Sequence, residues 1–175
     1  IAGSGQSLNA LLGFLRLVVG NGFISFDVDA ITAPHLVAQL QQGNKLARRA
    51  ALLLDCLALD SPAARTQIVK LGAVPRLVKM CRGGPKDLGT LNALGALEVL
   101  AHGATTVQDE AREAGIFPTL VPLLRPADAA AGEGSSKPAG GKDASPAPDP
   151  NELRINAALC LCALVQGNQV SREAA

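Results

Sequence analysis

Tryptophan and tyrosine are absent from this chain, and aromatic residues make up only 2% of its 175 positions. Proteins that bind single-stranded nucleic acid usually stack the bases on aromatic side chains, so this composition argues against nucleic-acid recognition. The formal net charge of +1 adds no general electrostatic attraction to DNA, RNA or anionic lipid. No apolar run reaches the roughly 18 residues of a membrane span, because Arg16 interrupts the best candidate. We therefore expect neither nucleic acid nor a membrane as a partner.

Cysteine is scarce, with four residues at Cys56, Cys81, Cys160 and Cys162. All four lie within apolar helical patterns, which predicts buried thiols. Cys160 and Cys162 are two residues apart, so on a helix they point to different faces and cannot share a metal ion. Buried, reduced thiols are typical of a reducing compartment, so we expect a cytoplasmic protein.

Motifs that carry catalysis or ligand binding are also missing. The run GGPK at residues 83–86 lacks the preceding strand and the remaining residues of a phosphate-binding loop. Asp27 and Asp29 flank one residue, as in calcium loops, but the other oxygen ligands and the glycine are absent. His35 and His102 have no catalytic partner at a suitable spacing. The sequence predicts no enzyme activity, cofactor, metal or small-molecule substrate.

Leucine, alanine and valine dominate what is present. Apolar residues make up 48% of the chain, which is ample for a buried core. Alanine and leucine are strong helix formers, so the composition suits closely packed helices.

The chain matches itself when it is shifted by 43 residues. The aligned pairs include Leu54 and Leu97, Leu57 and Leu100, Gly72 and Gly115, Pro75 and Pro118, and Leu77 and Leu120. A fixed period of about 40 to 47 residues built from helices is typical of an α-solenoid. Solenoids usually present surfaces that hold other molecules.

Each repeat is predicted to contain two short helices and one long helix. In the clearest copy, the polar cap and proline of 60–62 start a helix that runs to Leu71 and ends at Gly72. Pro75 opens a second helix that runs to Arg82. The long helix follows from about Asp87 to Ala101, with leucines spaced by threes.

Other copies are partial. Long helices are predicted over 6–19, 45–59 and 151–165, and a short helix begins near 170. The segment 23–31 should hold a short helix but has no glycine cap before the next helix opens at Pro34. The chain starts without methionine and stops inside a repeat, so we expect the natural protein to continue.

Residues 126–150 interrupt the period. The segment consists mainly of Ala, Gly, Ser, Pro and Asp and offers almost nothing to bury. We interpret it as a disordered insertion between the second and third helices of the third repeat.

The repeat junctions resemble those of armadillo proteins. Residues 113–124 read EAGIFPTLVPLL and residues 71–78 read LGAVPRLV. Both are similar to the armadillo junction between the first and second helices. The resemblance implies an all-α, right-handed superhelix over 1–175, with about three repeats and partial repeats at both ends. It indicates a fold and not a function.

Armadillo proteins of the import-receptor and catenin type hold extended peptides in a groove lined by the third helices. The resemblance implies a tryptophan ladder and an asparagine ladder there, and neither exists in this chain. The tryptophan positions hold Leu12, Leu52, Gly95 and Leu159, and the asparagine positions hold Arg16, Cys56, Val99 and Ala163. Without the amides, import-receptor activity is not expected.

A concave, apolar surface that receives a helix or a lobe of a protein partner is still expected. Its predicted lining is Leu52, Cys56, Gly95, Val99, Leu159 and Ala163. The alternative interpretation is that several of these residues belong to the core between repeats. Asn9, Asn92 and Asn156 recur near the starts of the long helices, where capping or polar packing explains them better than peptide binding. The sequence thus predicts a non-catalytic protein–protein interaction scaffold.

Two further hypotheses stay open. The segment 41–54, QQGNKLARRAALLL, resembles armadillo-type nucleotide exchange factors of seventy-kilodalton heat-shock chaperones. That resemblance implies a co-chaperone that embraces one lobe of the chaperone's ATPase domain and loosens its nucleotide. The Ala- and Gly-rich composition and the insertion also fit large ciliary or cytoskeletal scaffolds.

Basic residues gather between Arg65 and Lys86, a stretch without acidic residues. Arg76, Lys79 and Arg82 are spaced by three and share one helix face. The simpler interpretation is a solvated outer face. The functional one is a docking patch for an acidic protein partner.

Overall fold

The computed structural model describes residues 28–42, 45–125 and 148–175, and these residues form helices and no strand. The elements in chain order are α2 (Val28–Gln39), the 3-10 helix η1 (Leu40–Gln42), α3 (Lys45–Asp60), α4 (Pro62–Lys70), α5 (Ala73–Cys81), α6 (Leu88–Ala101), α7 (Thr105–Glu113), α8 (Phe117–Leu124), α9 (Pro150–Val165) and α10 (Gln169–Ala174). The predicted all-α class is confirmed. The predicted helix over 6–19 and most of the 126–150 insertion lie outside the described residues.

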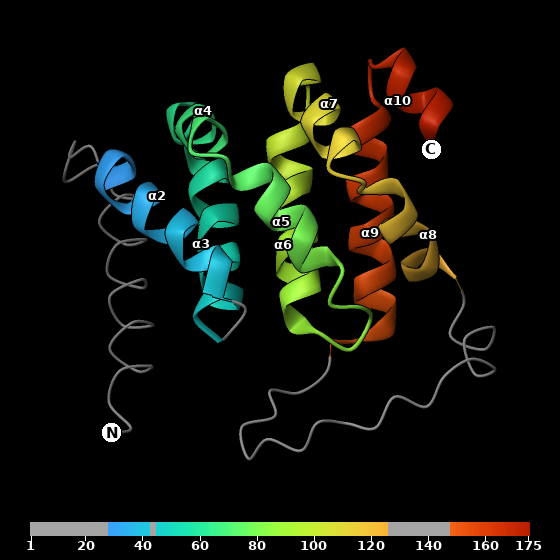
Figure 1. Cartoon of the computed structure of the whole chain (residues 1–175), viewed down its shortest axis with the longest axis horizontal. Helices are drawn as coiled ribbons and strands as arrows, with labels where there is room; N and C mark the ends of the chain where they lie inside the picture. The colour runs from blue at the N-terminus through green and yellow to red at the C-terminus, as the bar shows by residue number, and fades with distance from the viewer. Residues whose placement is uncertain (1–27, 43–44, 126–147) are drawn as a thin grey trace.

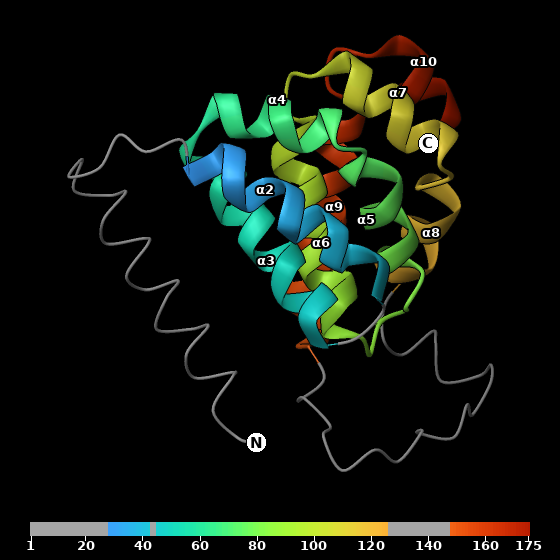
Figure 2. The same cartoon turned by 60° about the vertical axis from the view of Figure 1, so that its left-hand side comes forward.

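The three long helices α3, α6 and α9 stand side by side, with α6 in contact with both neighbours (Figure 1). Helices α2, α5 and α8 each pack on the long helix of their own repeat. In both Figure 1 and Figure 2, α4, α7 and α10 follow one another along the same end of the stack. The arrangement is the repeat solenoid that the 43-residue period predicts.

Local signals explain the helix boundaries. Pro62 opens α4, and the Ser61 hydroxyl accepts a hydrogen bond from the Ala64 amide at 3.1 Å. Gly72 and Gly115 adopt left-handed backbone angles, with φ of 71° and 82°, and let the chain turn from the first helix into the second. These caps were predicted from sequence and are confirmed.

The first described repeat departs from the prediction. The sequence predicts a short helix over 23–31 and a second one from Pro34, but α2 runs through Pro34 without a break. The physical reason is the missing glycine: later repeats turn at Gly72 or Gly115, and no residue of α2 can take their place. Pro34 lacks an N–H group, so its presence inside α2 removes one helical hydrogen bond.

Helix α6 is the centre of the core. Nine of its 14 residues are buried, compared with five of 16 in α3 and five of 16 in α9. Ala93 and Ala96 have no exposed surface, and their small side chains allow neighbouring helices to approach closely. The exposed residues of the long helices therefore lie on α3 and α9, whereas every residue of α6 is buried or half-buried.

Candidate partner-binding surfaces

Helices α3, α6 and α9 stand side by side, and the side of them that carries Leu52, Gly95 and Leu159 is here called the long-helix face. Leu52, Gly95 and Leu159 occupy equivalent positions on the three helices. Leu52 is 47% exposed and Leu159 is 45% exposed, while Gly95 between them has no side chain. The face therefore carries an exposed leucine on each flanking helix and no side chain at the matching position of α6.

Large apolar side chains that are exposed concentrate on the two flanking long helices. Isolated apolar residues on a surface are ordinary, but a group of them indicates an interaction site. Among the described residues, the group comprises Leu46, Leu52 and Leu59 on α3 and Ile155 and Leu159 on α9, with only Val121 and Val170 elsewhere.

Two carboxylates lie within this apolar surface. The Asp55 side chain rests against α6, where a Cβ atom on Gly95 would stand 3.3 Å from Asp55 Oδ2. Burial raises the pKa of Asp55, and repulsion from the nearby Glu98 carboxylate raises it further. Gly95 thus has a structural role, because its missing side chain leaves room for the Asp55 carboxylate.

The other residues predicted to line the concave surface are less accessible. Cys56 is half-buried, and Val99 packs against the core. Ala163 is 4% exposed and belongs to the core itself, so its side chain cannot form a broad contact with a partner. Of the six predicted residues, only Leu52 and Leu159 are exposed, and Gly95 between them is half-buried.

Sequence reasoning missed Asp55 and Glu98. These two residues are separated by the 43-residue period, so they repeat one position of the long helix. A search for acidic pairs at the repeat period would have found them.

Asn92 has the structural role that the sequence favours. Its Nδ2 atom donates a hydrogen bond to the Arg48 carbonyl oxygen at 2.9 Å and joins α6 to α3. Arg48 in turn pairs with Asp87, with Nε and Oδ1 separated by 3.0 Å. Asn92 is therefore occupied in repeat-to-repeat packing.

The predicted basic patch is divided by the fold. Arg76 Nη1 donates to the Val37 carbonyl oxygen at 2.8 Å, near the end of α2. Arg82 Nη2 donates to the Ala114 carbonyl oxygen at 2.9 Å, next to the end of α7. Lys79 lies between them in sequence and is exposed. Both arginines therefore connect helices, as well as carrying charge.

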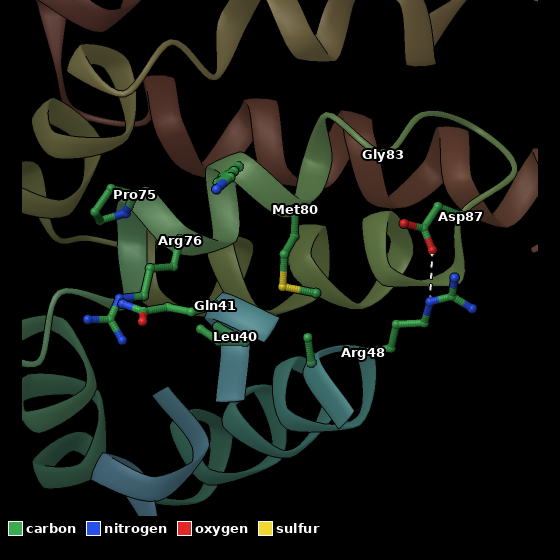
Figure 3. Close-up of a pocket in the computed structure, with 10 residues that line it drawn as sticks. Leu40, Gln41, Arg48, Pro75, Arg76, Met80, Gly83 and Asp87 are labelled. Carbon is green, nitrogen blue, oxygen red and sulfur yellow. Dashed lines mark ion pairs between the residues drawn. The ribbon is translucent and has the colours of Figure 1, made fainter. Parts of the chain in front are cut away.

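A cavity of about 580 Å³ lies between η1, the start of α3 and α5 (Figure 3). Met80 points across it from α5 toward η1, and the Arg48–Asp87 ion pair borders one side. Leu40, Gln41, Ala47, Arg48, Pro75, Arg76, Lys79, Met80, Gly83 and Asp87 line it. Apolar and basic residues line the cavity together, and the lining does not include Leu52, Gly95 or Leu159.

The cysteines differ in accessibility. Cys81 and Cys160 are buried, as predicted, and burial raises the pKa of Cys81 to about 12 and that of Cys160 well above its usual value. The prediction of burial is wrong for Cys162, which is exposed because it stands two residues from Cys160 on the other side of α9, and Cys56 is only half-buried. All four cysteines lie in the described ranges, and none forms a disulfide.

Among the residues that the structure describes, no group of three or more His, Cys, Asp or Glu side chains could hold a metal ion. None of the helices described is both long and apolar enough to cross a membrane.

No family model matches the sequence, and no curated protein matches it. Solved structures do match. A designed armadillo repeat protein is 23% identical with a TM-score of 0.59, and the match covers 80% of this chain and 50% of that one. Computationally designed armadillo repeat proteins for modular peptide recognition match at 22% identity and a TM-score of 0.59, with 81% and 50% covered.

A third match is a designed armadillo repeat protein in complex with the peptide (KR)4. It is 19% identical with a TM-score of 0.52, and the match covers 75% of this chain and 46% of that one. This chain thus spans about half the length of the designed proteins. The similarity shows that the fold is armadillo-like.

Proposed function

We propose that this protein is a scaffold that binds an extended segment of a protein partner on the long-helix face. The row of Leu52, Gly95 and Leu159, bordered by the Asp55 and Glu98 carboxylates, is the observation that carries the proposal. The segment would combine apolar and basic side chains, because the face presents both apolar surface and negative charge.

The apolar contribution comes from the row itself. Apolar side chains of the partner would cover Leu52 on α3 and Leu159 on α9, one on each side of α6. Each leucine is nearly half exposed, and covering apolar surface contributes about 25 cal/mol per Å². Between the two leucines the partner would meet the Asp55 carboxylate, which occupies the space that a side chain at Gly95 would take.

The charged contribution comes from the two carboxylates. Asp55 is held in an environment that disfavours its ionised form, since it is partly buried and lies near Glu98. A lysine or arginine between the two carboxylates would relieve that repulsion. The ionised form of Asp55, which is disfavoured in the isolated chain, would thus be stabilised in a complex.

The structural neighbours agree with this proposal without proving it. One group of designed neighbours is described as serving modular peptide recognition, and another designed neighbour is in complex with a basic peptide. Those statements concern the designed proteins. For this chain they support a test with peptides.

The test uses two labelled peptides, (LR)4 and (KR)4, and measures their binding by fluorescence anisotropy. We expect the whole chain to bind (LR)4 more tightly than (KR)4, because only the first peptide offers apolar side chains to the row. The double variant Asp55→Asn/Glu98→Gln should weaken binding of (LR)4 by about tenfold.

The matched control is Glu110→Gln/Glu113→Gln on α7, which removes another interacting acidic pair and changes the net charge equally. It should alter the affinity less than about twofold. If both double variants lost the same affinity for (LR)4, the binding would be explained by general charge attraction and not by the long-helix face. Equal affinity for (LR)4 and (KR)4 would contradict the claim that Leu52 and Leu159 contribute to binding.

The co-chaperone and ciliary hypotheses stay predictions, since no contact among the described residues distinguishes them from a general scaffold. The co-chaperone hypothesis has a direct assay. ADP release from a seventy-kilodalton heat-shock ATPase domain should accelerate at micromolar chain concentrations if the hypothesis is correct.

A further inference from the structure

We infer that the cavity between η1 and α5 is a second docking site, which takes an acidic peptide segment of a partner with one apolar side chain inserted. This site does not depend on the long-helix face. Its residues come from η1, from the first turn of α3 and from α5 with its following loop.

The floor of the cavity is apolar. Leu40 is 3% exposed and Ala47 is 1% exposed, and Met80 is half-buried beside them (Figure 3). The volume of about 580 Å³ lies within the range of cavities that accept small ligands, and it exceeds the needs of one leucine side chain. Methionine adapts its shape easily, so Met80 can adjust to the inserted group.

The rim of the cavity is positively charged. Lys79 is exposed, and Arg76 uses only Nη1 for its bond to the Val37 carbonyl oxygen, which leaves further N–H groups for a carboxylate. The third cation, Arg48, is already paired with Asp87. The site therefore offers two available cations around an apolar floor, and an acidic segment complements it.

The combination favours a peptide over other anionic partners. Nucleic acid would require a longer basic track and aromatic stacking, and the lining contains no aromatic residue. An anionic membrane would be attracted to a broad basic surface, whereas here the basic groups surround a concave site of limited size. A peptide side chain inserted between Leu40 and Met80 would fill the cavity, whereas a flat membrane surface could not enter it.

The fold also explains why Arg82 is excluded from the site. Its guanidinium donates to the Ala114 carbonyl oxygen near α7, and it does not line the cavity. The acidic-partner patch predicted from sequence thus narrows to Arg76 and Lys79.

The experiment uses the whole chain and a fluorescein-labelled peptide, EELEE, in an anisotropy titration. Lys79→Glu reverses a charge at the rim without touching the apolar floor. We expect this variant to lose at least about tenfold in affinity. Lys70→Glu is the matched control, because Lys70 is also exposed, ends α4 and does not line the cavity. It should bind within about twofold of the unmodified chain.

A second peptide, EESEE, tests the inserted side chain. It should bind more weakly than EELEE, because serine cannot fill the apolar floor. Three results would overturn the proposal: equal binding of the two peptides, equal losses for Lys79→Glu and Lys70→Glu, or binding to phosphatidylserine vesicles without binding to EELEE. Melting curves of both variants establish that each remains folded before the affinities are compared.

Discussion

Asp55 illustrates how one residue can link stability to recognition. Its carboxylate is partly buried between α3 and α6, and Glu98 adds repulsion. The raised pKa means that the folded chain holds the Asp55 proton more tightly than the unfolded chain does. This contribution to stability is complete below the usual pKa near 3.8 and is lost as the pH rises through the raised value.

Asp55→Asn is therefore expected to stabilise the fold at pH 7. The gain should be less than about 1 kcal/mol in the free energy of unfolding, because water screens a carboxylate that is only partly buried. The advantage should disappear when the pH falls below the usual pKa of Asp55. Thermal melts of both proteins between pH 3 and pH 7 measure the difference. A variant that is less stable at pH 7 would mean that the carboxylate makes a favourable contact.

Gly95→Ala tests whether the Asp55 carboxylate needs the space over Gly95. The added Cβ would lie 3.3 Å from Asp55 Oδ2, at the end of a flexible side chain that can move by a few tenths of an ångström. Alanine also favours a helix over glycine by about 1 kcal/mol. We expect stability to be unchanged or higher, and (LR)4 binding to be weaker because the added methyl group displaces the Asp55 carboxylate. A marked fall in melting temperature would show that Asp55 is fixed in place.

At the scale of helices, Gln108 joins the ends of two long helices. Its buried Nε2 lies 3.1, 2.9 and 3.0 Å from the carbonyl oxygens of Ala101, Ala163 and Gln166, so its two N–H groups are shared among three acceptors. One amide on α7 thereby satisfies acceptors at the ends of α6 and α9. The bond to the Ala163 carbonyl also shows how α7 covers that end of α9.

Gln108→Leu should lower the free energy of unfolding by about 2 to 3 kcal/mol, because buried carbonyl groups lose their donor. The comparison is Gln169→Leu, at an exposed glutamine whose bond to Glu173 is at the surface. That change should stay within about 0.5 kcal/mol. Urea denaturation of the two variants measures both values. Similar small losses would show that the amide contributes little to joining the helices.

The elements that could be predicted from sequence are those with local signals. Ser61 and Pro62 mark a helix start, and Gly72 and Gly115 mark turns, whatever packs around them. The position of a residue in the repeat predicted which helix contains it. It did not predict whether a neighbouring helix buries it. Ala163 was assigned to the accessible face by its register, yet α7 buries that end of α9.

Contacts between repeats were harder to predict for the same reason. Gln108 corresponds to Arg65 one period earlier, so the repeat gives no sign of an amide that joins two helix ends. The cavity likewise depends on how η1 approaches α5, which the spacing of apolar residues does not determine. Residues that make contacts within one repeat recur at the 43-residue period. Residues that make contacts between repeats do not have to recur at it.

At the scale of the whole molecule, stability should reside in the stack of long helices. Residues 126–147 contain no large apolar residue, so we expect them to add little to the core. The comparable connection between α5 and α6 needs only residues 82–87. Replacing 126–147 by about five glycine and serine residues should change the melting temperature by less than about 3 °C, since loop shortening has a small entropic effect. A large fall would assign a packing role to this segment.

The central claim is that the long-helix face receives the partner, and a methyl-resolved NMR titration with (LR)4 tests it directly. The methyl signals of Leu52 and Leu159 should shift together along one binding curve, while those of buried Leu77 on α5 stay in place. Asp55→Asn/Glu98→Gln should move that curve to higher peptide concentrations. The account would be contradicted if the Leu52 and Leu159 signals remained unchanged while the peptide bound elsewhere on the chain.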